Sequence, residues 1–192
     1  MVCLASGPSL TPADCTDVMA SGLITVAVNT TYQMAPWAEA VFAFDSAWWR
    51  VYAEEVAQQC TVARRYSVSD VLGRMGVQSL KGVEWFQSLP NSGACAINLA
   101  AGAGAKRVLL LGYDCQRAPD GRTHWHPDHP GKMSNARSLP RWPEHFARAR
   151  RFAASKGCEV FNCSRATALT CFERRPLDQM LRDERARTEA AP

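Results

Sequence analysis

Short apolar runs alternate along this chain with segments of helical spacing. Helices are predicted to begin after caps at Thr11, Ser46 and Ser92, and at Pro143 and Pro176, because hydroxyl side chains cap first turns and proline fits the first helical position. Short apolar runs between turn signals predict strands covered on both faces. The predicted strands are 2–5, 23–28, 40–44, 61–66, 108–111 and 158–161.

Strands that alternate with helices are typical of a parallel sheet, because each right-handed crossover places a helix on one face of the sheet. The length of 192 residues fits one domain with a substantial core. The sequence therefore predicts an α/β protein, a single Rossmann-like domain over 1–186 with a mostly parallel sheet and helices on both faces. Residues 187–192 are expected to form a frayed tail.

Small or polar residues follow most of the predicted strands. In a parallel sheet the carboxyl ends of the strands lie along one edge, where open α/β sheets bind ligands. We therefore expect these residues to meet in one crevice. They are Ser6-Gly7, Asn29, Asp45, Asp114, and Asn162 with Ser164.

The segment 91–114 contains the most informative of these units. An Ala-rich helix opens at Ser92-Gly93, a buried strand follows, and Asp114 comes just past its end. The first turn of such a helix presents free N–H groups, which bind anions such as phosphate. Asp114 and Asp45 are expected to face one ligand, as partners of a ribose or as ligands of Mg²⁺. The alternative is a purely structural helix–strand unit with a polar rim.

Composition narrows the class of protein. The chain is 47% hydrophobic and 21% charged, which is ordinary for a globular domain and argues against disorder. The net charge of +4 is modest and the basic residues are scattered, so no nucleic-acid-binding stripe is indicated. No apolar segment approaches the roughly 20 residues needed to cross a bilayer.

Eight cysteines raise the question of disulfides or zinc. They form no C-x-x-C pair, and several fall inside apolar segments, where a free cysteine acts as a small hydrophobic residue. No basic region precedes the first apolar run, so no secretory signal is read. The expectation is a reduced, cytoplasmic protein. Trp48, Trp49 and Tyr52, at helical spacing, are assigned to the core or to a subunit contact in a homo-oligomer.

The turn Ser6-Gly7-Pro8-Ser9-Leu10 resembles the G-x-G-P-S-L turn of a Rossmann-like nucleotide-binding superfamily. Its members include bacterial lipooligosaccharide sialyltransferases, motility accessory factors and hydroxymethylpterin pyrophosphokinase-like proteins. The likeness continues through Asn29, Asp45, Ser92-Gly93 and Gly112-Tyr113-Asp114, and small phage and prophage proteins with G-Y-D and H-W-H are also similar. The resemblance implies a nucleotide site whose phosphate lies at the helix N-terminus. The residues implied to hold the nucleotide are Gly7, Ser9, Asn29, Ser92 and Gly93.

Two departures from that family pattern bear on the substrate. Ala5 and Ser6 precede Gly7, so the leading glycine of the turn is missing. Cys115 and Gln116 follow the G-Y-D turn, where the sialyltransferases have tyrosine hydroxyls that stabilise the leaving phosphate. CMP-sialic acid is therefore not the expected donor.

The long loop after the G-Y-D turn contains His124-Trp125-His126-Pro127-Asp128-His129, which matches the H-x-H-x-D-H signature of metallo-β-lactamases. That superfamily needs further histidines and an acid downstream, and this chain has four histidines in all. A complete dizinc hydrolase is therefore excluded. A single Zn²⁺ held by some of His124, His126, Asp128 and His129 is one alternative, and a structural loop stacked over the crevice is another.

The sialyltransferases carry a histidine-rich loop after the corresponding turn, and one of its histidines is the general base. By that resemblance His126 or His129 deprotonates an acceptor hydroxyl, and Asp128 orients the base. The predicted function is a nucleotide- or nucleotide-sugar-dependent group transferase, glycosyl or phosphoryl/nucleotidyl, for which Mg²⁺ is the cofactor considered. The alternatives are a non-catalytic nucleotide-binding phage protein and a mononuclear metal-dependent hydrolase.

Overall fold

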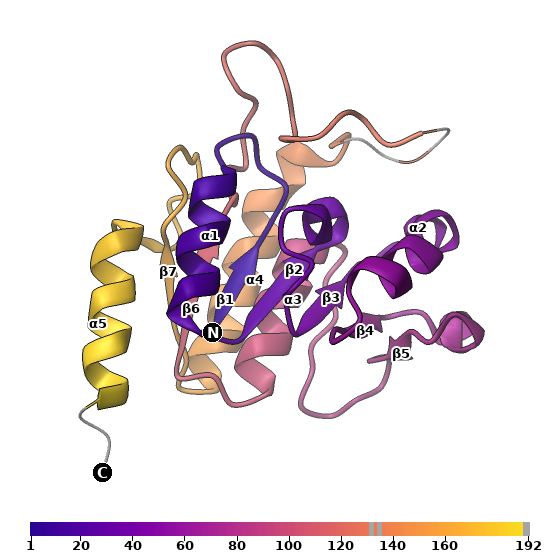
Figure 1. The fold of residues 1–192 in the computed structure, drawn as a ribbon, viewed down its shortest axis with the longest axis horizontal. Helices are drawn as coiled ribbons and strands as arrows, with labels where there is room; N and C mark the ends of the chain where they lie inside the picture. Colours follow the sequence, from indigo (N-terminus) through magenta and orange to yellow (C-terminus); the bar gives the residue numbers. More distant parts are fainter. Residues whose placement is uncertain (131–132, 134–135, 190–192) are drawn as a thin grey trace.

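The computed structural model describes residues 1–130, 133 and 136–189, and it contains one sheet of eight parallel strands (Figure 1). The strands are β1 (Val2–Leu4), β2 (Thr25–Val28), β3 (Ala40–Phe42), β4 (Arg64–Ser67), β5 (Gln78–Ser79), β6 (Arg107–Leu111), β7 (Glu159–Asn162) and β8 (Glu173–Arg174). The helices are α1 (Pro12–Ser21), α2 (Ser46–Gln59), α3 (Ser92–Gly102), α4 (Trp142–Ser155) and α5 (Leu177–Glu189), with 3₁₀ segments η1 (Asn29–Gln33), η2 (Asp70–Met75) and η3 (Leu139–Arg141).

The strand order is β5-β4-β3-β2-β1-β6-β7-β8. The chain therefore builds the sheet outward from β1 to β5, then returns to the other side of β1 with β6 and continues to β8. The order reverses between β1 and β6, and such a switch point leaves a crevice at the carboxyl ends of the strands. Those ends point to the top of Figure 1, where the long loop after β6 also lies.

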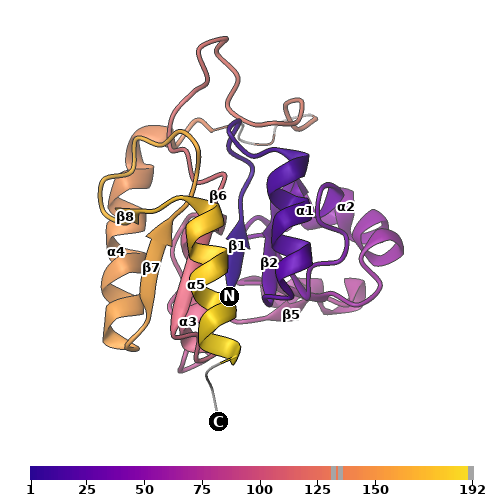
Figure 2. The same ribbon diagram turned by 60° about the vertical axis from the view of Figure 1, so that its left-hand side comes forward.

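Alternate residues of the strands face opposite layers of helices. Cys3 of β1 packs in one core with α3 and α4, whereas its neighbours Val2 and Leu4 pack in a second core with α1, α2 and α5. Figure 2 shows α3 and α4 on one side of the sheet and α1 and α2 on the other. The predicted α/β fold, with a parallel sheet and helices on both faces, is confirmed, and the sheet is parallel throughout.

The start of α1 agrees with the sequence pattern. The Thr11 hydroxyl accepts the N–H of Asp14 at 3.2 Å, and the Asp14 carboxylate accepts the N–H of Thr11 at 3.0 Å, which completes a capping box. Gly22 ends the helix with a φ of 67°, in the left-handed region that suits glycine.

Two other caps differ from the prediction. Asn91, not Ser92, is the N-cap of α3, because Asn91 holds the extended conformation and its side chain accepts the N–H of Ala94 at 2.9 Å. Ser92 is then the first helical residue. Likewise Ser46 lies within α2, and Asp45 precedes it without a side-chain capping bond.

The edges of the sheet and the C-terminal helix also differ from the prediction. Strands β5 and β8 were not predicted, because two residues each are too few to show a periodicity. Helix α5 extends to Glu189 and so includes 187–189, which were assigned to a frayed tail. The rest of that predicted tail, 190–192, lies outside the described residues.

Most of the cysteines and two aromatic residues of α2 are buried. All eight cysteines are free thiols; Cys115 and Cys171 are half-buried and the others are buried. Trp48 and Trp49 of α2 are buried in the core, as predicted, and Tyr52 packs against it. Within the described part of the chain, no helix combines the length and apolar character that crossing a membrane requires.

Candidate functional site

A cavity of about 580 Å³ lies at the switch point between β1 and β6, at the carboxyl ends of β1, β2, β3 and β6. This volume is in the range of small-molecule sites. Its polar lining comprises Ser6, Asn29, Asp45, Ser46, Asn91, Ser92, Asp114, Gln116, Thr123, His124, His129 and Ser138, and its aromatic lining comprises Phe44, Trp48, Tyr113, Trp142 and Phe146.

Two glycines allow the loops after β1 and β6 to cross in direct contact. The N–H of Gly7 donates to the carbonyl of Gly112 at 2.9 Å. A Cβ on Gly7 would overlap that carbonyl oxygen, and a Cβ on Gly112 would overlap the carbonyl oxygen of Ala5. Gly112 also has a φ of 69°. Gly7 lines the cavity as predicted, and it is required there by the contact between the two loops.

Ser9 and Asp114 join the same two loops by hydrogen bonds. Ser9 donates its N–H to Asp114 Oδ2 at 2.8 Å and its hydroxyl to Oδ1 at 2.6 Å. Burial raises the pKa of Asp114, and the Ser9 hydrogen bonds act in the opposite direction. Ser9 is absent from the described lining of the cavity, so its donors serve Asp114 and not the cavity.

The first turn of α3 faces the cavity with two free donors. Asn91 caps the helix through Ala94, and its carbonyl accepts the N–H of Cys95 at 3.0 Å. The N–H groups of Ser92 and Gly93 have no hydrogen-bond partner within the described part of the chain, and both residues line the cavity. These two donors lie at the positive end of the helix dipole and are suited to an anion.

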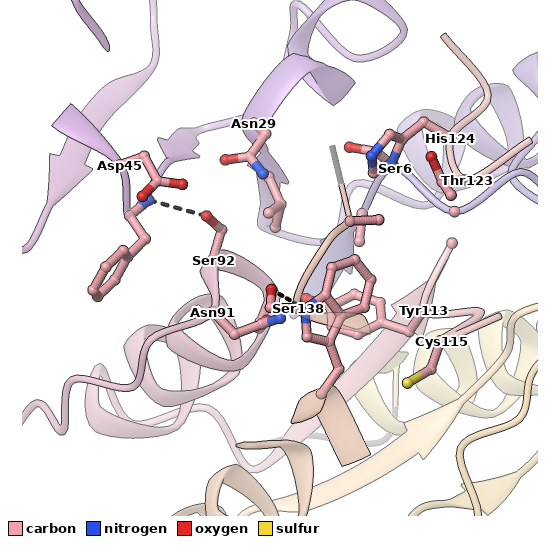
Figure 3. Close-up of a pocket in the computed structure, with 18 of the residues that line it drawn as sticks. Ser6, Asn29, Asp45, Asn91, Ser92, Tyr113, Cys115, Thr123, His124 and Ser138 are labelled. Carbon is pink, nitrogen blue, oxygen red and sulfur yellow. Dashed lines mark hydrogen bonds between the residues drawn. The ribbon is translucent and has the colours of Figure 1, made fainter. Parts of the chain in front are cut away.

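The residue types at positions 92 and 93 are explained by packing. Ser92 Oγ accepts the N–H of Phe44 at 3.0 Å, which ties α3 to the end of β3 (Figure 3). The Tyr113 hydroxyl donates to the carbonyl of Gly93 at 3.1 Å, and a Cβ on Gly93 would lie 3.1 Å from the Tyr113 ring. The donors available at the predicted anion site are therefore the backbone N–H groups, since the Ser92 hydroxyl is engaged with Phe44.

Asp45 and Asn29 complete this side of the cavity. Asp45 lies beside Ser92, with Asn29 between them and His124 in the view of Figure 3. The carboxylate of Asp45 has no hydrogen-bond partner among the described residues, and desolvation raises its pKa. Asp45 and Asp114 line one cavity, as predicted, but Asp45 is the acid whose oxygens are available to a ligand.

Three non-glycine residues of the described chain have a positive φ: Asn29 at 51°, Cys115 at 51° and Ala136 at 55°. All three line this cavity. A left-handed conformation costs a side-chain-bearing residue on the order of 1 kcal/mol, and such strain gathers at functional sites. Backbone conformation is thus a second observation, independent of side-chain chemistry, that singles out this cavity as a candidate site.

The histidine loop, residues 123–129, forms the opposite side of the cavity. His124 and His129 line the cavity, whereas His126 and Asp128 are absent from its described lining. The rings of His124 and His126 are stacked with their centroids 4.9 Å apart and an angle of 4° between their planes. The ring of His129 lies 4.9 Å from that of His126 and 6.1 Å from that of His124. The Tyr52 hydroxyl lies 3.3 Å from His129 Nδ1.

Two polar atoms of this loop are buried without a partner. His126 Nδ1 lies 2.6 Å from the carbonyl of Pro127, which assigns the proton to Nδ1 and leaves Nε2 as the acceptor. His126 Nε2 and Trp125 Nε1 are both buried and lack a hydrogen bond in the described part of the protein. The backbone N–H of Trp125 donates to the carbonyl of Ser6 at 3.1 Å, which anchors the loop to the turn that follows β1.

Burial keeps the histidine cluster uncharged. It lowers the pKa of both His124 and His129 to about 4, and the neighbouring imidazoles act in the same direction. The carboxylate of Asp128 opposes this effect at both rings. Burial also lowers the pKa of His126. All three imidazoles are therefore neutral at pH 7, the form in which a histidine can accept a proton.

The zinc alternative finds no support in this geometry. The lone pair of an imidazole lies in the plane of its ring, so the parallel rings of His124 and His126 cannot direct their lone pairs to one ion. Within the described ranges, no group of three or more His, Cys, Asp and Glu residues is arranged to hold a metal ion.

Asn162 and Ser164 were predicted to reach the same crevice, but they support its rim. Ser164 Oγ accepts the N–H of Tyr113 at 2.8 Å, and the Ser164 N–H donates to Asn162 Oδ1 at 3.0 Å. Neither residue belongs to the described lining of the cavity. They hold the loop after β6 in place.

Several residues that line the cavity were not predicted from the sequence. Trp142 and Phe146 of α4 cover one wall, and Thr123 and Ser138 come from the long loop. Trp142 donates from Nε1 to Ser138 Oγ at 2.9 Å (Figure 3). The aromatic residues at the start of α4 carry the only available signal, because their spacing puts them on one helical face.

Comparisons of this chain with protein families, with curated proteins and with solved structures found no match.

Proposed function

We propose that this protein is a nucleotide- or nucleotide-sugar-dependent group transferase that binds its ligand in the cavity between β1 and β6. The observation that carries the proposal is the pair of N–H groups of Ser92 and Gly93, at the first turn of an 11-residue helix, which have no hydrogen-bond partner among the described residues. A helix N-terminus of this kind favours a phosphate group. The volume of the cavity and its place at the switch point support a ligand of nucleotide size.

Bound phosphates carry negative charge and need a counterion. The described lining of the cavity contains no lysine or arginine that could provide it. Mg²⁺ bound through phosphate oxygens keeps several waters and needs only one or two carboxylates. Asp45 fits that role, because its carboxylate is at the cavity and has no other partner within the described residues. The metal would neutralise charge as it develops on the leaving phosphate.

The general base in this proposal is His129, with His124 beside it. Of the three residues that the sequence assigned to catalysis, His129 is the one that lines the cavity. The Tyr52 hydroxyl lies 3.3 Å from Nδ1 and orients the ring, and the proposed role of this imidazole is to accept a proton from an acceptor hydroxyl. His126 and Asp128 then act through the packing and charge of the loop.

A thermal-shift panel tests the binding step. Nucleoside mono-, di- and triphosphates and UDP-, GDP- and CMP-sugars are added to the full chain with and without Mg²⁺. A ligand at about 100 times its Kd adds about 2.7 kcal/mol to the free energy of unfolding and raises Tm by several degrees. No shift with any of these ligands would contradict the proposal.

A turnover assay separates the catalytic reading from its alternative. Release of free nucleotide from the stabilising ligand, in the presence of sugar or hydroxyl acceptors, supports the transferase. Tight binding with no release under any acceptor condition would favour the non-catalytic nucleotide-binding protein. The proposal includes a cytoplasmic location, which the reduced cysteines favour. It also includes a phage or prophage origin, which the family resemblance implies.

A further inference from the structure

The charge balance of the cavity poses a problem for an anionic ligand. Its described lining contains two carboxylic acids, Asp45 and Asp114, and no lysine or arginine. The remaining titratable side chains that line it are His124 and His129 together with Tyr113 and Cys115. Burial raises the pKa of the tyrosine and of the cysteine, so only the two imidazoles can become positive.

The two imidazoles form a compact pair that is placed to share one charge. Their ring centroids are 6.1 Å apart, and His126 lies 4.9 Å from each. Two positive charges at this spacing would repel each other strongly, whereas a single charge next to an anion is stabilised. The cluster therefore holds one proton at most when a ligand is bound.

We propose that the His124–His129 pair takes up one proton when an anionic ligand binds, so that an imidazolium of this pair forms part of the anion site. The inference rests on the proposed function and adds the means by which the cavity recognises a phosphate-bearing ligand. The groups that face the pair are the ring of His126, the carboxylate of Asp128, the Tyr52 hydroxyl and, across the cavity, Asp45 and Asp114.

This linkage also bears on the base of the proposed transfer. A histidine with a pKa near 4 is a weak proton acceptor at neutral pH. An anion within a few ångströms favours the charged form and moves the pKa of the imidazole upward. The bound ligand would thereby raise the pKa of the pair toward neutral pH, and the unprotonated fraction of His129 would be a stronger general base in the occupied site than in the empty one.

Isothermal calorimetry on the full chain tests the proton uptake. The probes are UDP-glucose, GDP-mannose and ADP-ribose, whose pyrophosphate diesters do not titrate between pH 5 and 9. At pH 7, the heat of binding should vary with the ionisation enthalpy of the buffer and report uptake of up to one proton. Between pH 8 and pH 6 the Kd should fall, toward tenfold per pH unit in the limit of one full proton.

Variants assign the proton to the pair. The double substitution His124→Gln with His129→Gln should abolish the uptake and make the Kd independent of pH. His145→Gln, on α4 and outside the cavity, should leave both the uptake and the pH slope as they are in the parent chain. Melting curves of each variant show whether the fold is retained.

The two hypotheses fail in different ways. Binding of none of the three probes at any pH from 6 to 8 would overturn the proposed function itself. Binding with no buffer-dependent heat and a constant Kd would overturn the proton uptake alone. Uptake that persists in the double variant would move the proton to another group and overturn its assignment to the pair.

Discussion

Two segments at the same cavity use their polar groups in opposite ways. The glycine crossover is formed by Gly7, Ser9, Gly112 and Asp114. Its polar groups bind one another: Gly7 donates to the carbonyl of Gly112, and Ser9 donates to both carboxylate oxygens of Asp114. The histidine loop, 123–129, keeps two polar atoms buried without partners in the described structure and three neutral imidazoles. The crossover shapes the cavity, whereas the histidine loop and the first turn of α3 contain polar groups that have no partner among the described residues.

This contrast shows that a polar residue at a strand end is not by itself a ligand-binding residue. Asp114 comes at the end of β6 as Asp45 comes at the end of β3, yet both oxygens of Asp114 are taken by Ser9. The carboxylate of Asp45 has no such partner within the described residues. Only the three-dimensional contacts distinguish the two acids.

The largest expected effect comes from breaking the crossover. Gly112→Ala combines a strained φ of 69° with overlap between the new Cβ and the Ala5 carbonyl. We expect the free energy of unfolding to fall by about 3 kcal/mol or more, measured by urea denaturation. Gly22→Ala is the matched control, because Gly22 has a φ of 67° but no atom within 4 Å of the added Cβ. Its cost should stay near 1 kcal/mol. Equal losses in the two variants would mean that the loops do not touch at Gly112.

The next largest effect is a decrease in the free energy of unfolding at acidic pH, caused by the buried histidines of the histidine loop. His124 and His129 have a folded-state pKa of about 4, below the unfolded value near 6.5. The unfolded chain therefore binds more protons in this window, and stability falls as the pH drops from 6.5 toward 4. We expect a loss of at least about 2 kcal/mol by pH 4.5, measured by urea denaturation at each pH.

The double variant His124→Gln with His129→Gln isolates this contribution from that of the carboxylates. Its stability should change less than that of the parent between pH 6.5 and 4.5, because the two groups that gain protons on unfolding are gone. Parallel pH curves for the two proteins would show that these imidazoles titrate normally in the folded state.

The sequence carried enough information for the fold and for the edge of the sheet where the cavity lies. Apolar runs of strand length between helical segments predict a parallel sheet, and a parallel sheet brings its carboxyl ends together. Asn29, Asp45 and Ser92, far apart in the chain, thus reach one cavity as expected. The prediction depends only on the direction of the strands, which the alternating pattern determines.

The roles within the cavity could not be derived in the same way. Asn91 and Ser92 are both good caps, and the choice between them follows from the extended backbone at Asn91. In the histidine loop, which has no period, nothing in the sequence indicates that His124 and His129 line the cavity while His126 faces Pro127. Contacts made by irregular segments depend on tertiary packing, which a pattern of residue types does not encode.

A smaller effect is expected from opening the crossover at its hydrogen bonds. Asp114→Asn and Ser9→Ala should each lower the free energy of unfolding by about 1–2 kcal/mol, because the first replaces one of the two acceptor oxygens with a donor and the second removes the donating hydroxyl. In a double-mutant cycle the two losses should be less than additive, with a coupling of about 1 kcal/mol. Pairing Asp114→Asn with Ser138→Ala, which lies outside the crossover, provides the reference for additivity. Additive losses for the Ser9 pair would contradict a direct bond between the two side chains.

The smallest expected change in stability comes from Asn91→Asp at the first turn of α3. An aspartate keeps the acceptor that caps Ala94 and adds a negative charge at the positive end of the helix, so the free energy of unfolding should stay within about 1 kcal/mol of the parent value. The same charge would stand beside the free N–H groups of Ser92 and Gly93 and repel a phosphate there.

We therefore expect the Kd of a pyrophosphate-bearing ligand such as UDP-glucose to rise about tenfold or more in Asn91→Asp, measured by calorimetry at pH 7. Asn91→Ser, a neutral cap, should keep both the stability and the Kd of the parent. If the aspartate variant binds the ligand as tightly as the serine variant does, the phosphate does not lie at α3. The anion would then bind only at the histidine side of the cavity, and the first turn of α3 would have a structural role, as the glycine crossover has.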